Sequence, residues 1–266
     1  MKKKICIITG ASGAIGSHLV SFFKKKKWKV ILMSSKKNKN SFYFNLSKVN
    51  ISNESRLYNA DLLIHCAYDF KKVDWNDIYK TNIIGSKKIF KLCKRNKIKK
   101  IINISSVSAF KDATSNYGMA KFKIEKIAEK FDVINLKCGL IVSKKAKLYS
   151  KIYFFSKKLR LFPLIEKGDQ KLHLLHLSDL ANFIYKIIPI RKKIKNRTFY
   201  VCNPNYIYFK DLIMKIDNKK IFINIPKFFI ENSLKLFSLL NIKLGFDYDN
   251  YLGLINYNKK INIKNY

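Results

Sequence analysis

The chain has 266 residues, 48% of them hydrophobic and 14% aromatic, which excludes a disordered protein and suffices for a large core. Its formal net charge of +38 suggests a polyanionic partner such as nucleic acid or an acidic membrane. The lysines are spread along the whole chain, without an arginine-rich stripe or an RNA-binding signature, so we expect no specific nucleic-acid binding.

The cysteines and the apolar segments indicate a cytoplasmic protein. The five cysteines are odd in number, widely spaced and without a C-x-x-C pair, which predicts free thiols in a reducing compartment. The apolar run after the basic start is too short for a signal peptide, and no transmembrane segment is expected. His173 and His176 stand without the company of metal ligands, so we expect no metal site.

Apolar runs alternate with helical patterns through the first half of the chain. Unbroken apolar strands are typical of a parallel sheet covered on both faces, and helices between them predict a doubly wound α/β fold of the Rossmann type. We expect this dinucleotide-binding core to span residues 1–140. The predicted strands are 5–9, 28–33, 42–46, 61–66, 100–105 and 133–137, and the predicted helices are 14–26, 75–93 and 117–130.

The pattern loosens in residues 141–266. We expect a small C-terminal substrate-binding lobe here, with segments that return to the core to give a single catalytic unit. Residues 228–246 combine apolar and basic side chains, which fits a helix of the lobe, the reading we favour, or a helix on a membrane surface. The predicted helices are 147–158, 178–188, 208–216 and 227–241, with short strands near residue 173 and at 198–201.

A glycine-rich turn, TGASGAIG, stands between the first strand and the first helix. Gly10, Gly13 and Gly16 allow a tight turn, close approach to a pyrophosphate and close packing of the helix on the strand. The start of the helix offers free N–H groups to phosphates. The turn predicts dinucleotide binding, with cofactor contacts from the glycines and from Ser12, Ala14 and Ile15.

The end of the second strand bears on the choice of cofactor. An acidic residue here usually binds the adenosine ribose of NAD, but the sequence continues Ser34, Ser35, Lys36. Hydroxyl and ammonium groups suit a 2′-phosphate. We therefore favour NADP slightly over NAD, with Ser35 and Lys36 as cofactor-binding residues.

Tyr117 and Lys121 are four residues apart, which places both on one face of a helix. With 15 tyrosines and 55 basic residues, roughly three such pairs arise by accident. Three others are present, at Tyr68, Tyr153 and Tyr206. The setting, after a strand that ends in Ser105 and Ser106, distinguishes Tyr117 from them.

Several segments together resemble the extended short-chain dehydrogenase/reductase family, and within it the NAD-dependent epimerase/dehydratase branch that acts on nucleotide sugars. They are the glycine turn, DLLIHCA at 61–67, the run from 79 to 110, YGMAK at 117–121, NLKCGLIV at 135, HLLHLSDLANFI at 173, TFYVCN at 198 and the tail YLGLINYNKKINIKN. The resemblance covers nearly the whole chain and is strongest up to about residue 140.

The resemblance implies roles for individual residues. Tyr117 would donate or accept the proton of a sugar hydroxyl or carbonyl group, and Lys121 would lower the pKa of its phenol and hold the nicotinamide ribose. Ser106 would hydrogen-bond the reacting oxygen. Further cofactor contacts are expected from Asn45, Leu46, Ala67 and Asn82, the last with a mainly structural role. We also name Arg160 as a candidate for gripping the substrate diphosphate, because arginine binds phosphates in a bidentate manner.

The resemblance implies an oxidoreductase or isomerase of nucleotide-sugar and polysaccharide biosynthesis. We expect a 4-keto-sugar reductase or a 4-epimerase that forms homodimers through the helices after strands four and five. Val107 and Ser108 stand where sugar 4,6-dehydratases have an Asp-Glu pair, which argues against dehydration. Only ten residues separate Ser106 from Tyr117, and Cys138 replaces the proline or aromatic residue common in relatives. The alternative is an inactive NAD(P)-binding sensor of the same fold.

Overall fold

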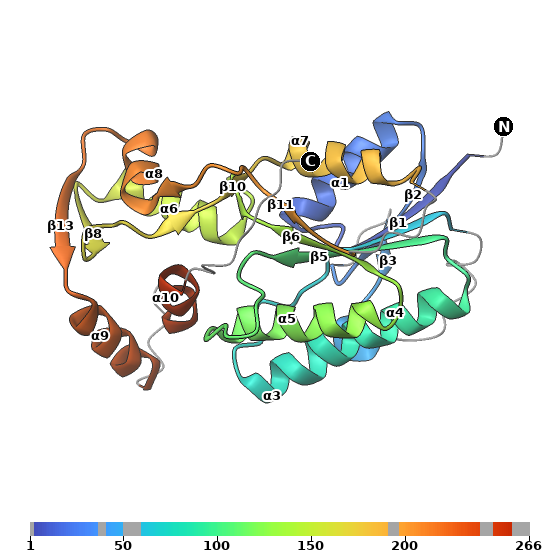
Figure 1. Cartoon of the computed structure of the whole chain (residues 1–266), viewed down its shortest axis with the longest axis horizontal. Helices are drawn as coiled ribbons and strands as arrows, with labels where there is room; N and C mark the ends of the chain where they lie inside the picture. The colour runs from blue at the N-terminus through green and yellow to red at the C-terminus, as the bar shows by residue number, and fades with distance from the viewer. Residues whose placement is uncertain (1–2, 37–40, 50–59, 191–196, 240–246, 257–266) are drawn as a thin grey trace.

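A parallel sheet of seven strands forms the centre of the protein, in the order β11-β6-β5-β4-β1-β2-β3 (Figure 1). The computed structural model describes residues 3–36, 41–49, 60–190, 197–239 and 247–256. The strand order reverses beside β1, so the crevice for a ligand is expected outside the carboxyl ends of β1 and β4. The predicted Rossmann-type sheet is confirmed. Its strands are β1 (Ile5–Thr9), β2 (Lys29–Ser34), β3 (Phe42–Tyr43), β4 (Leu62–His65), β5 (Lys100–Ser106), β6 (Ile134–Cys138) and β11 (Thr198–Val201).

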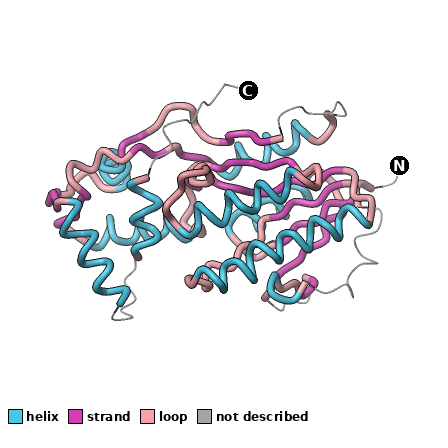
Figure 2. The backbone as a smooth tube through the Cα atoms, turned by 60° about the horizontal axis from the view of Figure 1, so that its bottom comes forward, coloured by secondary structure: helices cyan, strands magenta, loops and turns pink. Residues whose placement is uncertain are grey.

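Helices cover both faces of the sheet (Figures 1 and 2). On one face α1 (Ala14–Lys25) contacts α7 (Leu177–Ile187), and on the other α4 (Ile84–Arg95) lies beside α5 (Asn116–Glu129). In β1, Cys6 and Ile8 enter the core under α1 and α7, whereas Ile7 enters the opposite core. Because both faces are buried, β1 and most of β4 are apolar without alternation.

The third strand is shorter than the predicted 42–46. β3 ends at Tyr43, and a 3₁₀ turn, η1 (Leu46–Lys48), follows. The side chain of Asn45 accepts a hydrogen bond from the Ser47 backbone N–H at 3.0 Å and so caps this turn. The apolar Phe44 and Leu46 are buried without belonging to a strand, which explains the longer prediction.

The predicted helix 75–93 consists of three segments. A short helix, α3 (Trp75–Ile78), leads into a π-helical turn, η3 (Tyr79–Ile83), and α4 continues to Arg95. π-Helical turns are rare and often lie at functional sites. This turn carries Asn82, one of the residues expected at the cofactor site.

The second half of the chain builds a lobe beside the sheet (Figure 1). α7 and β11 return to the central layers, and α10 had not been predicted. The division after residue 140 stays a prediction, and residues 257–266 of the tail lie outside the described residues. The lobe contains α6 (Lys147–Lys158), α8 (Phe209–Ile216), α9 (Lys227–Leu239), α10 (Tyr248–Ile255) and the strand pairs β7 (Leu140–Ile141) with β10 (Leu174–Leu175), β9 (Lys171–Leu172) with β12 (Ile207–Tyr208), and β8 (Leu161–Ile165) with β13 (Ile221–Ile225).

Two further predictions concern thiols and membrane spans. All five cysteines are free thiols. Across the described ranges, no helix combines the length and apolar character that crossing a bilayer requires.

Candidate functional site

The glycine-rich turn lies at the switch point of the sheet. Gly10 has a φ of +65°, a left-handed conformation that favours glycine. A Cβ atom at Gly10 would lie 2.8 Å from the backbone nitrogen of Ala67. The loop after β4 therefore runs directly against the turn after β1, and Gly10 and Ala67, two residues expected at the cofactor site, are neighbours.

The remaining glycines shape the start of α1. A Cβ atom at Gly16 would overlap the carbonyl oxygen of Gly10, whereas one at Gly13 would meet only that oxygen, at 3.2 Å, and otherwise open space. α1 begins at Ala14 without a side-chain cap, so the N–H groups of its first turn are available to a ligand. An open cradle at a helix start fits the phosphates of a dinucleotide.

We expect Gly16→Ala to weaken NAD(P)H binding by about tenfold or more and to lower the free energy of unfolding by about 1–3 kcal/mol. The reason is that the added methyl group forces the Gly10 backbone to move. Fluorescence titration and urea unfolding would measure the two effects. Gly253→Ala is the matched control, because its Cβ would meet only Ser115 Oγ at 3.9 Å. Unchanged cofactor binding in Gly16→Ala would contradict the assignment of the turn.

The end of β2 is tied to the glycine-rich turn. Ser34 is buried, and its hydroxyl donates a hydrogen bond to Ser12 Oγ at 2.8 Å. The backbone N–H of Lys36 in turn donates to Ser34 Oγ at 3.1 Å. Ser35 and Lys36 are exposed. Ser34, which the sequence interpretation did not assign to the site, thus fixes the segment that carries these two residues.

Asn45 and Leu46 make structural contacts after β3. Asn45 caps η1, and Leu46 is buried in the core under α4 and α5. Their role in cofactor binding stays a prediction.

The three predicted catalytic residues lie together at the carboxyl end of β5. Ser106 ends β5, and its hydroxyl is near enough to the Tyr117 phenol to act towards a lower pKa of that group. Ser115 caps α5 by accepting from the Gly118 N–H at 3.1 Å, which starts the helix one residue before Tyr117. One turn later, the ammonium of Lys121 lies 5.9 Å from the centroid of the Tyr117 ring.

Lys121 is buried beside this phenol. Its Nζ donates to the carbonyl oxygen of Ile104 at 2.9 Å and lies 4.9 Å from the centroid of the Tyr68 ring. Burial lowers the pKa of Lys121 to about 8 because the charged form loses water, although the nearby Cys66 and Cys138 act in the opposite direction.

The pKa of Tyr117 is raised rather than lowered. Burial is the main cause and Cys138 adds to it, whereas the hydrogen bond from Ser106 acts in the other direction. In the protein alone, burial therefore acts against the lowering that the resemblance implies.

Two aromatic side chains from the loop after β4 flank Tyr117. The ring of Tyr68 meets it edge-on at 5.2 Å between centroids, and the ring of Phe70 stacks on it at 5.7 Å. Lys147 of α6 lies 5.5 Å from the centroid of the Phe70 ring. Tyr117 thus stands where the core sheet meets the lobe.

A buried chain of hydrogen bonds supports this loop. Burial lowers the pKa of His65 to about 3, so its ring is neutral. Ser86 donates its proton to the Asn82 carbonyl oxygen at 2.6 Å, so His65 Nε2 carries the hydrogen that reaches Ser86 at 3.0 Å. His65 Nδ1 then accepts from Thr9 Oγ1 at 2.8 Å, which itself accepts from the Ala67 N–H at 3.3 Å.

Asn82 continues this chain to the aromatic residues. Its Oδ1 accepts from the Asp69 N–H at 2.7 Å, and its Nδ2 donates to the Asp69 carbonyl oxygen at 3.2 Å. Asn82 therefore clamps the residue between Tyr68 and Phe70. These contacts agree with the mainly structural role that the resemblance implies for Asn82.

Asp249 of α10 binds the start of the helix that carries Tyr117. Its carboxylate accepts from the backbone N–H of Asn116 at 2.5 Å and from that of Tyr117 at 3.3 Å. A carboxylate at this position also complements the positive end of the helix dipole. Burial raises the pKa of Asp249, and these two hydrogen bonds oppose the increase. The last described helix thus holds the backbone of Tyr117.

We expect Asp249→Ala to lower the free energy of unfolding by about 0.5–2 kcal/mol, as for the loss of a helix cap, and turnover by about ten- to a hundredfold. The cause is an unanchored backbone at Tyr117. Urea unfolding and steady-state kinetics would measure both. Asp211→Ala, an exposed aspartate on α8, is the control. Equal kinetics for the two variants would show that Asp249 does not position Tyr117.

A buried ion pair lies behind the catalytic cluster. Glu125, one turn after Lys121, is 3.0 Å from the ammonium of Lys137 on β6, and both side chains are buried. Ser105 donates to the same carboxylate at 2.5 Å. Burial raises the pKa of Glu125 even though Lys137 and Ser105 favour its charged form.

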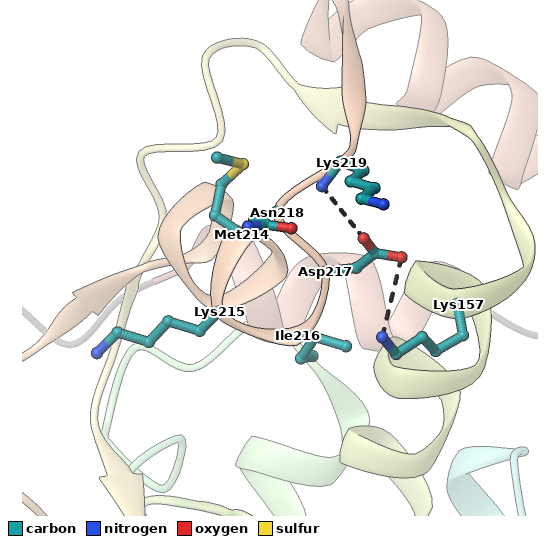
Figure 3. Close-up of a pocket in the computed structure, with 7 residues that line it drawn as sticks. All are labelled: Lys157, Met214, Lys215, Ile216, Asp217, Asn218 and Lys219. Atoms are coloured by element: carbon teal, nitrogen blue, oxygen red, sulfur yellow. Dashed lines mark hydrogen bonds and ion pairs between the residues drawn. The ribbon is translucent and has the colours of Figure 1, made fainter.

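Arg160 lies apart from this cluster. It is exposed in the bend between α6 and β8, and its carbonyl oxygen accepts from the N–H of Ile221 on β13. A surface pocket of about 470 Å³ occupies the same outer end of the lobe, near Asp217 (Figure 3). The pocket is lined by Lys157, Met214, Lys215, Ile216, Asp217, Asn218 and Lys219, and so contains none of the predicted catalytic residues.

Sequence reasoning missed several of these residues. Glu125 continues the four-residue spacing of Tyr117 and Lys121, and His65 interrupts an apolar strand, so both left a signal. Asp249 left none, because its contact joins residues more than 130 positions apart.

Comparisons with known proteins agree with this geometry. Residues 6–202 match the family described as the NAD dependent epimerase/dehydratase family. No protein among curated ones matches the sequence.

Solved structures of the same fold share little sequence with the chain. UDP-N-acetylglucosamine 4-epimerase from Bacillus cereus is 16% identical, with a TM-score of 0.68 over 95% of this chain and 96% of its own. UDP-glucose 4-epimerase from Thermotoga maritima, solved with UDP-glucose, is 17% identical, with a TM-score of 0.62 over 83% of this chain and 85% of its own. The dTDP-glucose 4,6-dehydratase DesIV from Streptomyces venezuelae, solved with NAD and TYD, is 14% identical, with a TM-score of 0.67 over 84% of both chains.

Proposed function

The chain belongs to the NAD dependent epimerase/dehydratase family, and on this basis we propose that it is an NAD(P)-dependent 4-keto-sugar reductase or 4-epimerase acting on a nucleotide-activated sugar. The observation that carries the proposal is the cluster of Ser106, Tyr117 and Lys121 beside the glycine-rich turn.

Different residues of the crevice bind different parts of the cofactor. The turn at Gly10, Gly13 and Gly16 takes the phosphates on the N–H groups at the start of α1. Lys121 takes the nicotinamide ribose. When bound, the nicotinamide supplies or accepts the hydride at the sugar carbon.

The proton moves at the phenol oxygen of Tyr117. In reduction of a keto group, the phenol donates its proton to the carbonyl oxygen, which Ser106 holds by a hydrogen bond; in oxidation, the phenolate accepts the proton of the hydroxyl. The charge on Lys121 opposes the effect of burial and favours the phenolate, as does the positive nicotinamide. Asp249 and Asn82 keep Tyr117 and its aromatic neighbours in place.

The preference for NADPH or NADH helps to distinguish the reductase from the epimerase. A reductase consumes NADPH, and the absence of an acid after β2 favours this reading slightly. We expect the protein to prefer NADPH, and Lys36→Glu to lower the ratio of NADPH to NADH affinity by about tenfold. Lys48→Glu, an exposed lysine near β3, is the matched control. A native preference for NADH would contradict the role given to Ser35 and Lys36.

A substrate screen tests the proposed reaction. The purified protein, after its bound nicotinamide has been measured, is given NADH or NADPH with UDP- and GDP-sugars and their 4-keto forms. Consumption of cofactor with a keto form indicates a reductase, and interconversion of 4-epimers without net consumption indicates an epimerase. Cofactor binding without turnover across the panel would favour the inactive sensor.

Three further proposals follow from the resemblance. The lobe binds the substrate, although Arg160 lies apart from the catalytic cluster and its role in gripping a diphosphate remains to be tested by substitution. The protein forms a homodimer through α4 and α5, which sedimentation at several concentrations would test. A cytoplasmic location also remains a proposal.

A further inference from the structure

The outer end of the lobe carries an apolar surface. β8 and β13 pair in parallel, with Leu161 opposite Ile221 and Pro163 opposite Ile223. Alternate residues point inward, where Phe162 is buried. The outward residues are exposed by 52% at Leu161, 50% at Ile221 and 46% at Ile223, and Pro163 is also exposed.

The start of α9 carries two more exposed apolar residues at this end of the lobe. Phe228 and Phe229 follow β13 after two intervening residues and are exposed by 70% and 62%. Leu234 is buried and fixes α9 to the lobe, in agreement with the favoured reading of this segment as a lobe helix. Figure 1 shows β8, β13 and α9 together at one end of the molecule. We call Leu161, Pro163, Ile221, Ile223, Phe228 and Phe229 the outer apolar face.

Basic residues border this face at one edge. Because the two strands are parallel, the residues that precede them lie at the same edge. Lys158 and Arg160 precede β8, and Lys219 precedes β13; all three are exposed. Asp217, the acid at this edge, is already paired with Lys220 at 3.1 Å (Figure 3 shows its surroundings). This edge of the face is therefore positively charged.

We propose that the outer apolar face docks on an anionic lipid bilayer. Singly exposed apolar residues are normal, but six gathered at one end of a molecule indicate an interaction surface. An apolar face bordered by cations enters the boundary of the lipid headgroups, while the cations contact lipid phosphates. A second copy of this chain would bring two positive borders together, and a nucleic acid would leave the apolar residues in water.

Vesicle sedimentation with the full chain tests this proposal. Vesicles of phosphatidylcholine alone are compared with vesicles that also contain about 30% phosphatidylglycerol. We expect at least about tenfold stronger binding to the anionic vesicles, weakened by salt. We expect the variant Phe228→Ser with Phe229→Ser to lose binding, and Lys158→Glu with Arg160→Glu to weaken it by about fivefold for each residue.

Two matched variants control for apolar character and charge. Val73→Ser removes an apolar residue that is 73% exposed elsewhere, and Lys87→Glu with Lys88→Glu reverses exposed charges on α4; both should bind as the native chain does. Thermal unfolding checks that each variant is folded. Equal binding to both vesicles, no binding, or binding that survives loss of the two phenylalanines would overturn the proposal. Self-association that the phenylalanine variant abolishes, without vesicle binding, would assign the face to a second copy instead.

Discussion

Tyr117→Phe is expected to lower turnover by at least about a hundredfold while the protein still binds its cofactor. The substitution removes only the phenol oxygen, which accepts and donates the proton in the proposed reaction. The ring still packs against Tyr68 and Phe70, so the fold and the crevice should be kept. Steady-state kinetics with the substrate found in the screen, together with NADPH titration, would measure both quantities.

Tyr153→Phe is the matched control for this prediction. Tyr153 also stands four residues before a lysine, Lys157, but lies on α6, away from the end of β5. We expect it to retain native turnover. Turnover that persists in Tyr117→Phe would refute the proposed mechanism, even if cofactor binding at the glycine-rich turn were established.

Lys137→Met is expected to lower the free energy of unfolding by about 3–5 kcal/mol near neutral pH. The substitution leaves the carboxylate of Glu125 buried without its partner at 3.0 Å. Burial already raises the pKa of Glu125, so the folded state of the variant binds a proton more readily than the unfolded chain does. The loss of stability should therefore be smaller at acidic pH and grow as the pH rises. Urea unfolding at several pH values would measure it.

Lys126→Met provides the comparison. Lys126 is also 3.0 Å from a glutamate, Glu129, but both side chains are largely exposed, so we expect a change below about 1 kcal/mol. Adding Glu125→Gln to Lys137→Met should recover part of the lost stability, because the unpaired charge is removed. If Lys137→Met and Lys126→Met lowered the free energy of unfolding by similar amounts, burial of the pair between Glu125 and Lys137 would not explain its contribution to stability.

The sheet could be predicted because its strands are buried on both faces. β1 and most of β4 are continuous apolar runs, and β5 is mainly apolar before its two terminal serines. The ends of β1 and β5 also located Gly10 and Ser106. The lengths of elements were harder to predict. A 3₁₀ turn capped by Asn45 follows β3, and a π-helical turn divides the helix after β4, although neither changes the apolar pattern of the sequence.

The surroundings of the site could not be predicted, because they depend on contacts between distant segments. The hydrogen bonds from Thr9 through His65 to Ser86 join three elements, and no spacing along the chain indicates them. The pKa of Tyr117 is a similar case. The spacing to Lys121 suggested a lower value, but the extent of burial, which depends on the whole fold, raises it.

The contact between Asp249 and the start of α5 joins segments that are synthesised at different times. The glycine-rich turn and the residues of the catalytic cluster are all synthesised within the first half of the chain, and their strands can pair as they emerge. The carboxylate that holds the backbone of Tyr117 emerges more than 100 residues later. A nascent or truncated chain that lacks α10 would therefore have all strands of the sheet and the side chains of Ser106, Tyr117 and Lys121, but no Asp249 carboxylate at the start of α5. The residue that anchors the start of α5 is therefore synthesised long after the strand and the helix that carry Ser106, Tyr117 and Lys121.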